Sequence, residues 1–423
     1  MQAGTKGDKS RSSLRIGERH TSGIGRRKAE IAKAILPIDF CSHRRTRTNR
    51  GDRASACDEV ACVKTALGFN KKKPHTCHAE TLRTRRTEEY GTIHLLMKML
   101  MLVTVMVPWM VGAATMAKTD VYARETDAFL AARDGRVQTA QIAAIRRATA
   151  GETDDLKAVR TARNTWAPLP DGVEAERMSP TMQLYRPKGG RDLPLLIYLH
   201  GGGWVIGSLA SCSAFCGAVA AKGPAVLALD YPLAPEHPFP SALNAVCAAF
   251  RAVVSDPARF GADPARVSIG GDSSGGNLSL AAALVLQKEC LKPRALVLYY
   301  PVTEARADGS ASWRTFATGC GMDAAFMDVC LVAYLNGHDP RDPLVSPAFA
   351  TDEQLRRLPP VHILGADRDV LRDQGLRFAR RLDALGCPVR AEVLPGSTHL
   401  FVTVKGQPAA FARAVDFAAE ATK

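Results

Sequence analysis

Seven short apolar runs, most of them separated by segments with helical periodicity, constrain the fold of this chain most strongly. We expect strands at residues 182–187, 193–200, 224–230, 266–271, 294–301, 361–366 and 389–395. Helices are expected at 241–255, 275–288 and 371–386, and a last one at 408–421. Nearly continuous apolar strands that alternate with helices indicate a mostly parallel sheet covered by helices on both faces. The sequence therefore predicts an α/β protein.

The segments before the first strand differ from the rest in composition. The chain has a net charge of +14, and residues 1–95 hold 21 Lys and Arg against 10 Asp and Glu. We interpret residues 1–96 as a basic segment, either disordered or a non-native extension of the gene. Residues 118–165 contain apolar side chains at helical spacing among many charged ones, which predicts two or three amphipathic helices. Residues 166–423 form the α/β domain.

Residues 97–117 are strongly apolar, and 99–117 carry no charged side chain. This length suits a signal peptide or a membrane anchor. A start of translation at Met97 or Met116 is a third interpretation. Localisation therefore stays open: exported or membrane-anchored if the segment acts as signal or anchor, cytoplasmic if translation starts near Met116. Membrane contact is expected through this segment alone.

Two glycine-rich strings follow predicted strands. The carboxyl ends of the strands in a parallel sheet are the usual place of the active site. HGGGW occupies 200–204, and GGDSSGGN occupies 270–277 at a strand-to-helix turn. A nucleophilic serine at such a sharp turn needs very small neighbours two residues away on each side. Ser273 has Gly271 and Gly275 at these positions, which makes Ser273 the candidate nucleophile.

The glycines of the first string can bring backbone N–H groups close to a reacting oxygen. Gly202 and Gly203 are the first choices as donors to an oxyanion, and Gly201 is the next. Ser274 would complete this oxyanion hole with its own N–H at a helix N-terminus.

A serine nucleophile needs a histidine base and a carboxylate that orients it. The histidines after Ser273 are His338, His362 and His399. His399 is the best candidate because it lies on a loop after the last predicted strand. Candidates for the carboxylate are Asp367, Asp369 and Asp373, and Asp369 begins the pattern D-x-L-R-D.

Five motifs in this order resemble the hormone-sensitive lipase family of α/β-hydrolases, the bacterial esterases with an HGGGW-type motif. They are HGGGW at 200–204, DYPLAPEHPFP at 230–240, GDSSGGN at 271–277, DVLRDQG at 369–375 and HLF at 399–401. The resemblance implies an α/β-hydrolase fold in which residues 118–165 form a small N-terminal helical cap and residues 166–423 the catalytic domain. It also places Ser273, Asp369 and His399 at the positions of the family's catalytic triad.

The resulting hypothesis is a carboxylic ester hydrolase that works through an acyl-enzyme intermediate. The bulky side chains of Trp204 and Leu400 are predicted to line the substrate pocket, and with a short cap they favour short acyl chains. The alternative is a non-catalytic protein that binds a small molecule in the same pocket. We expect a small-molecule ester as the partner, no cofactor, no metal ion and no nucleic acid. The oligomeric state stays open.

Overall fold

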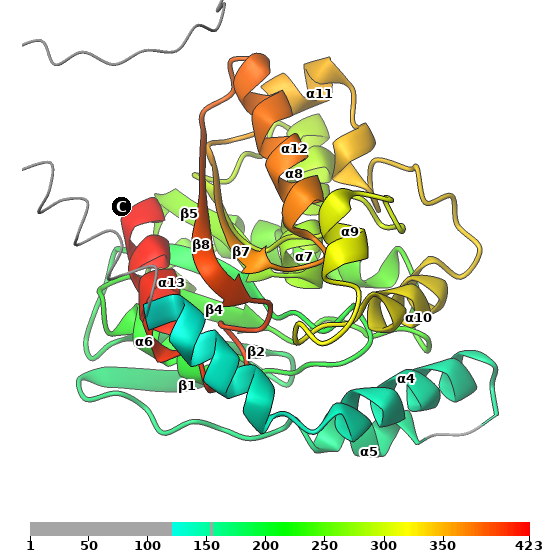
Figure 1. Ribbon diagram of the computed structural model, residues 1–423. Helices are drawn as coiled ribbons and strands as arrows, with labels where there is room; N and C mark the ends of the chain where they lie inside the picture. The colour runs from blue at the N-terminus through cyan, green and yellow to red at the C-terminus, as the bar shows by residue number, and fades with distance from the viewer. Residues whose placement is uncertain (1–120, 153–154) are drawn as a thin grey trace, which may run out of the picture. The chain divides into compact units, whose positions relative to one another are not determined.

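The computed structural model describes residues 121–152 and 155–423, and the predicted segments 1–96 and 97–117 lie outside the described residues. Its centre is a sheet with the strand order β1-β2-β4-β3-β5-β6-β7-β8 (Figure 1). The strands are β1 (Val173–Ser179), β2 (Met182–Pro187), β3 (Leu193–Leu199), β4 (Ala225–Leu229), β5 (Ala262–Asp272), β6 (Leu296–Tyr299), β7 (Val361–Arg368) and β8 (Val389–Thr398). Strand β2 is antiparallel to both of its neighbours, and every other neighbouring pair is parallel. The predicted mostly parallel sheet is confirmed.

Helices cover both faces of the sheet because its central strands are apolar on both sides. Along β3, Leu195, Ile197 and Leu199 belong to one apolar core, and the alternating Leu196 and Tyr198 belong to another. The first core is covered by α7 (Ser241–Ser255), α8 (Ser274–Leu286) and α12 (Arg372–Ala384), and the second by α6 (Ser213–Ala220) and α13 (Pro408–Ala421). Figure 1 shows α6 beside α13, away from α7, α8 and α12.

In the described part of the chain, three helices precede β1. Residues 121–132 are helical, followed by α4 (Gly135–Thr149) and α5 (Leu156–Thr161). The helix at 121–132 is tied to the rest of the domain by a salt bridge of 2.5 Å between Asp127 and Arg368. Helix α4 packs against α10 (Ala324–Leu335), which lies between β6 and β7 in the sequence. This arrangement brings residues from the predicted cap into contact with the catalytic domain.

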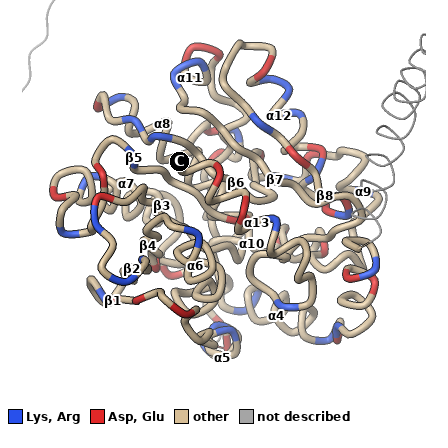
Figure 2. The backbone as a smooth tube through the Cα atoms, turned by 90° about the vertical axis from the view of Figure 1, so that its left-hand side faces the viewer, with Lys and Arg blue, Asp and Glu red and all other residues tan. Residues whose placement is uncertain are grey.

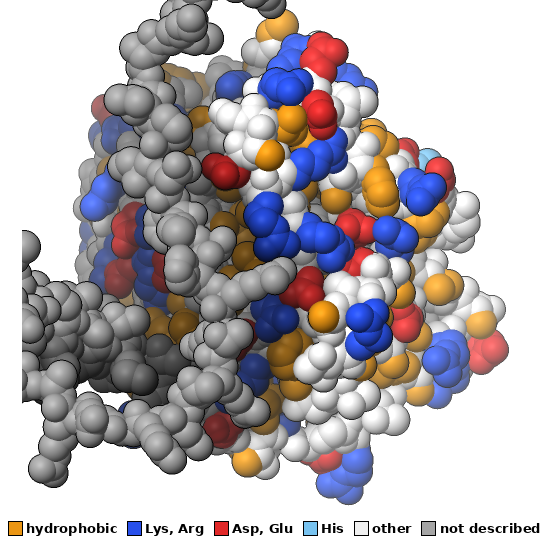
Figure 3. Space-filling view, turned by 45° about the horizontal axis from the view of Figure 1, so that its top comes forward, with side chains coloured by type: hydrophobic (Ala, Val, Ile, Leu, Met, Phe, Trp, Pro, Cys, Tyr) orange, Lys and Arg blue, Asp and Glu red, His pale blue; other side chains and the backbone are white. Residues whose placement is uncertain are grey.

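Two further helices of the described part are short, α9 (Ala311–Thr315) and α11 (Asp352–Arg356). Charged side chains of both signs occur on the outer segments, including those labelled α5 and α11 (Figure 2). The face seen in Figure 3 likewise intersperses Lys and Arg with Asp and Glu. Within residues 121–152 and 155–423, no helix is both long and apolar enough to cross a membrane.

The apolar pattern of the sequence did not predict strand β1 or helix α6. Strand β1 lies at the edge of the sheet, and Val173 is its one buried residue. An edge strand with a single buried residue carries no apolar run that could reveal it. Helix α6 is eight residues long and rich in small side chains, so its helical periodicity is too short to read.

Candidate active site

Ser273 lies at the turn between β5 and α8, and its backbone is strained. Its φ of 55° and ψ of −115° are unusual for a residue with a side chain. A Cβ atom added to Gly271 or Gly275 would collide with the carbonyl oxygen of Leu199 on the neighbouring strand β3. The two glycines therefore let the turn pass close to β3, and this close passage holds Ser273 at the carboxyl edge of the sheet.

His399 is paired with Asp369. The His399 Nδ1 atom lies 2.7 Å from Asp369 Oδ2, and each side chain is 1% exposed. The other carboxylate oxygen of Asp369 accepts a hydrogen bond of 2.9 Å from the Leu371 N–H. The His399 ring also packs on Tyr300, with 4.2 Å between ring centroids. A carboxylate on Nδ1 orients the imidazole and leaves Nε2 to act on a proton.

The competing aspartates point elsewhere. Asp367 is 41% exposed, pairs with Arg372 at 3.2 Å and accepts a hydrogen bond from the Gly396 N–H at 3.0 Å. Asp373 accepts a hydrogen bond of 2.8 Å from the Ser312 N–H. Of the three aspartates that the sequence left open, Asp369 is the one that reaches His399.

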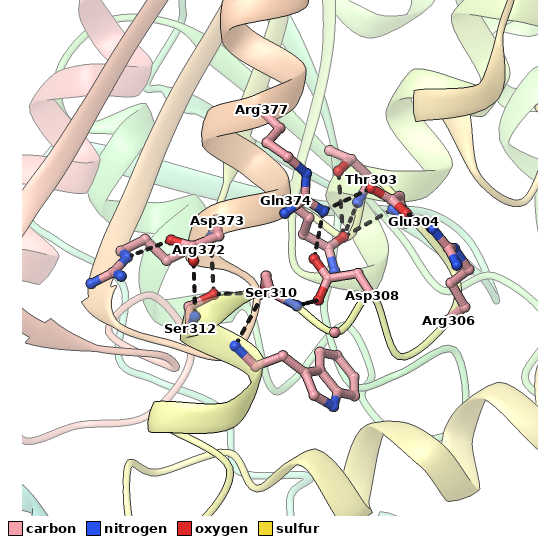
Figure 4. A network of polar contacts seen from close by, with 12 residues as sticks. Thr303, Glu304, Arg306, Asp308, Ser310, Ser312, Arg372, Asp373, Gln374 and Arg377 are labelled. Carbon is pink, nitrogen blue, oxygen red and sulfur yellow. Dashed lines mark hydrogen bonds and ion pairs between the residues drawn. The ribbon is translucent and has the colours of Figure 1, made fainter.

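A polar network braces the turn that carries Asp369, and sequence reasoning missed it (Figure 4). The Ser312 hydroxyl donates to the Val370 carbonyl at 3.0 Å, one residue after Asp369. Gln374, in the first turn of α12, accepts hydrogen bonds from the Thr303 and Glu304 N–H groups at 2.7 and 2.9 Å. These bonds join the loop after β6 to the start of α12. The partners are distant in sequence, so no local motif signals them.

The glycine loop after β3 lies against Ser273, and its three glycines have different surroundings. The Gly201 N–H donates a hydrogen bond of 2.8 Å to Asp272 Oδ1, which also accepts one of 2.7 Å from the Tyr198 hydroxyl. The prediction that Gly201 serves as an oxyanion donor is therefore wrong, because its N–H is already bound. Gly202 and Gly203 line the cavity at Ser273, with φ of 126° and 62°. Both angles favour glycine.

Ser274 is the first residue of α8 and is fully buried. Its N–H therefore lies at the positive end of the helix dipole, directly after Ser273. The position is compatible with the predicted role of this N–H beside those of Gly202 and Gly203.

A cavity of about 280 Å³ opens at Ser273 and His399. Its other lining residues include Gln138 from α4, Phe326 from α10 and Leu400 beside His399. Helix α4, part of the predicted cap, thus contributes to the wall of this cavity, and Leu400 lies where the sequence placed it.

Trp204 does not line this cavity, contrary to the prediction. Its side chain is fully buried and stacks on Tyr334 of α10, with ring centroids 4.3 Å apart and planes within 4°. Its φ is 61°, and the cavity is lined by Gly202 and Gly203 just before it but not by Trp204. Trp204 thus anchors the glycine loop to α10 and leaves Leu400 as the predicted pocket residue.

No group of three or more His, Cys, Asp or Glu side chains is placed to hold a metal ion within the described residues. The reactive groups that the structure brings together at the cavity are Ser273 and His399, with Asp369 hydrogen-bonded to His399. The strand–turn–helix at Ser273 and the order serine, aspartate, histidine are those of an α/β-hydrolase.

Comparison with known proteins agrees with this fold class. Residues 196–403 match a family described by the α/β hydrolase fold. The carboxylic ester hydrolase LipN of Mycobacterium tuberculosis is 38% identical over 231 residues, which span 52% of this chain and 60% of LipN. Ethyl acetate hydrolase of Pseudomonas putida is 36% identical over 230 residues, which span 52% of this chain and 71% of that protein.

The fold of the chain is also similar to that of a solved esterase structure. The thermostable esterase from Pseudomonas putida ECU1011 superposes with a TM-score of 0.62 at 26% identity, over 71% of this chain and 96% of that one. The chain belongs to the hormone-sensitive lipase-like esterase family of the α/β-hydrolase superfamily. This membership supports the predicted carboxylic ester hydrolase activity.

Proposed function

We propose that this chain hydrolyses carboxylic esters of short acyl chains, with Ser273 as nucleophile, His399 as general base and Asp369 as the group that orients His399. The observation that carries the proposal is the His399–Asp369 hydrogen bond of 2.7 Å, in a cavity that also contains the strained Ser273. The buried His399–Asp369 pair and the strained backbone of Ser273 both cost free energy of folding. A catalytic role accounts for their occurrence together at one cavity.

The proposed reaction has two halves. The Ser273 oxygen attacks the ester carbonyl while its proton passes to His399 Nε2, and a carbon–oxygen bond forms. The tetrahedral intermediate then expels the alcohol, which takes that proton from His399. Water then attacks the acyl-enzyme in the same way, with His399 taking its proton. The second tetrahedral intermediate releases the acid, and His399 returns the proton to Ser273. Asp369 keeps Nδ1 protonated and stabilises the charge that His399 carries between these steps.

The negative charge of each intermediate needs N–H donors. Gly202, Gly203 and Ser274 are the proposed donors, because they flank Ser273 from the glycine loop and from the start of α8. Backbone donors that are fixed before the reaction need no reorganisation when the charge develops. The anchoring of the loop through Trp204 and Tyr334 supports this preorganisation.

The short acyl preference rests on the size and walls of the cavity. A volume of about 280 Å³ also has to hold part of the alcohol. The bulky side chains of Leu400 and Phe326 form part of its wall, together with Ser273 and His399. Each buried methylene contributes about 0.8 kcal/mol while it fits, and overpacking reverses the gain. We expect kcat/KM to be highest for acyl chains of roughly two to six carbons.

The experiment is a hydrolysis profile of p-nitrophenyl esters with acyl chains of increasing length. We expect kcat/KM to be highest for short acyl chains. Ser273→Ala should lose activity, and Ser274→Ala should retain most of it. Activity that keeps rising to long acyl chains would contradict the pocket argument. No hydrolysis of any ester would favour the alternative, a protein that binds a small molecule without catalysis.

A further inference from the structure

We propose that the preferred ester carries a free carboxylate, which Arg163 and Arg133 bind inside the active-site cavity. The inference rests on the proposed ester hydrolysis and names the substrate class for it. Both arginines line the same cavity as Ser273 and His399. Arg133 lies in the link between the helix at 121–132 and α4, and Arg163 follows α5.

The two guanidinium groups differ from a neighbouring arginine that has a structural role. Arg160, three residues before Arg163, binds both carboxylate oxygens of Glu236 and the carbonyl oxygens of Val205 and Ala234. Among the described residues, no side-chain hydrogen bond or salt bridge engages the guanidinium of Arg163 or Arg133. Arg133 has one further contact, a cation–π interaction with Phe129 at 5.3 Å.

Burial makes an unpaired guanidinium unfavourable. Burial lowers the pKa of Arg163, and the positive charge of Arg133 lowers it further, while Asp272 acts in the opposite direction. Burial also lowers the pKa of Arg133, against an opposing effect of Asp323. Arg133 and Arg163 are both only partly exposed, so an unpaired charge at either position is poorly solvated. The two cations lie close enough to repel each other, so one anion between them would relieve both.

The carboxylates that face the cavity are already engaged. Asp134 binds Arg136 through its side chain, at 2.8 Å for the closest atom pair. Asp272 accepts hydrogen bonds from Tyr198 and Gly201, as described above, and among the described residues it forms no salt bridge with Arg133 or Arg163. The carboxylates at the cavity therefore do not pair with Arg133 or Arg163, and a negatively charged ligand can balance these two positive charges.

A carboxylate suits this place better than a neutral polar group. A guanidinium presents a planar fork of donors that matches the two oxygens of a carboxylate. Both arginines and Ser273 line one cavity of about 280 Å³, so a carboxylate and an ester joined by a short chain can both lie in it. Half-esters of short dicarboxylic acids combine both requirements.

The test compares two esters of the same shape with the full-length protein. Monoethyl succinate carries a carboxylate where ethyl 4-methylpentanoate carries an isopropyl group, and both release ethanol. Hydrolysis is followed by titration of the released acid near neutral pH. Because a hydrogen bond to a charged group contributes enough for roughly a tenfold change, we expect kcat/KM for monoethyl succinate to be higher by about tenfold or more.

Variants connect this preference to the arginines. Arg163→Met should lower the ratio of the two kcat/KM values by about tenfold, and Arg163→Lys should keep part of it because the charge remains. Arg146→Met removes an exposed positive charge from α4 outside the cavity and should leave the ratio unchanged. If Arg163→Met does not fold, Arg133→Met is measured instead, with the same expectation.

The outcomes separate the two proposals. Hydrolysis of the neutral ester with a ratio at or below one, unchanged in Arg163→Met, would overturn the carboxylate site and leave ester hydrolysis standing. An equal fall of the ratio in Arg146→Met would overturn it as well, because it would show a general effect of charge. Hydrolysis of neither ester, or of any p-nitrophenyl ester, would overturn the proposed function itself.

Discussion

Replacement of Gly275 by alanine would test the geometry that holds Ser273. The added Cβ atom would lie 2.7 Å from the carbonyl carbon of Leu199 and 2.9 Å from the carbonyl oxygen of His200. Both neighbours are backbone atoms of β3 and the glycine loop, so no flexible side chain can yield. The turn and the loop would have to move apart.

This clash sets the expected loss of stability and activity. Overpacking of a tight interior costs about 1–3 kcal/mol. At about 2–4 °C per kcal/mol, the melting temperature should fall by roughly 2–12 °C. A shift of a catalytic group by about 1 Å can cost about 100-fold in rate. Gly275→Ala should therefore lower kcat/KM for a short p-nitrophenyl ester by about 100-fold.

Gly375→Ala is the matched control. Gly375 lies inside α12, and a Cβ atom there would meet no atom within 4 Å. Alanine is the better helix former by about 0.5–1 kcal/mol, so this variant should melt slightly higher and keep its activity. Thermal melts and initial rates of both variants decide the matter. A Gly275→Ala protein with wild-type melting temperature and rate would refute the reasoning.

Three further predictions concern the acid, the loop anchor and the buried carboxyl. Asp369→Asn should lower kcat by about 10⁴-fold and Asp367→Asn by less than about threefold, measured as ester hydrolysis; equal losses would contradict the assignment. Trp204→Ala should lower the free energy of unfolding by about 3–5 kcal/mol in urea titrations, and a loss under about 1 kcal/mol would contradict its anchoring role. Burial raises the pKa of Asp272, so its ionisation above about pH 4 destabilises the fold. Asp272→Asn should therefore become more stable relative to the wild type as pH rises from about 4 to 8, and a constant difference in urea midpoints would contradict this.

The sequence predicted those parts of the fold whose signals are local. The apolar runs located seven of the strands, and the helices at 241–255 and 408–421 coincide with α7 and α13. Glycine spacing around Ser273 was informative because the clash that it avoids arises within one turn and its neighbouring strand. Strand β1 was missed because its exposed residues carry no apolar signal.

The site was predicted less completely because several of its features depend on distant contacts. The choice between Asp367 and Asp369 needs the position of Arg372 and Gly396, which no spacing gives. The sequence ranks Gly201 behind Gly202 and Gly203 as a donor but cannot show that its N–H is bound to Asp272. Trp204 was placed in the pocket because it is large and follows the glycines.

The tertiary structure explains these corrections. The partner of Trp204, Tyr334, comes from a helix 130 residues further along the chain. The two cavity arginines, Arg133 and Arg163, also went unnoticed, because their meaning depends on which carboxylates nearby are already paired. Such features become visible when the segments are folded together.

Covalent labelling of the nucleophile tests the central claim most directly. A p-nitrophenyl phosphonate forms a stable adduct with an activated serine, and peptide mass spectrometry locates it. We predict one adduct per chain on Ser273, present in Ser274→Ala and absent in Ser273→Ala, with loss of ester hydrolysis in step with labelling. An adduct on Ser274, or full activity in Ser273→Ala, would contradict the account.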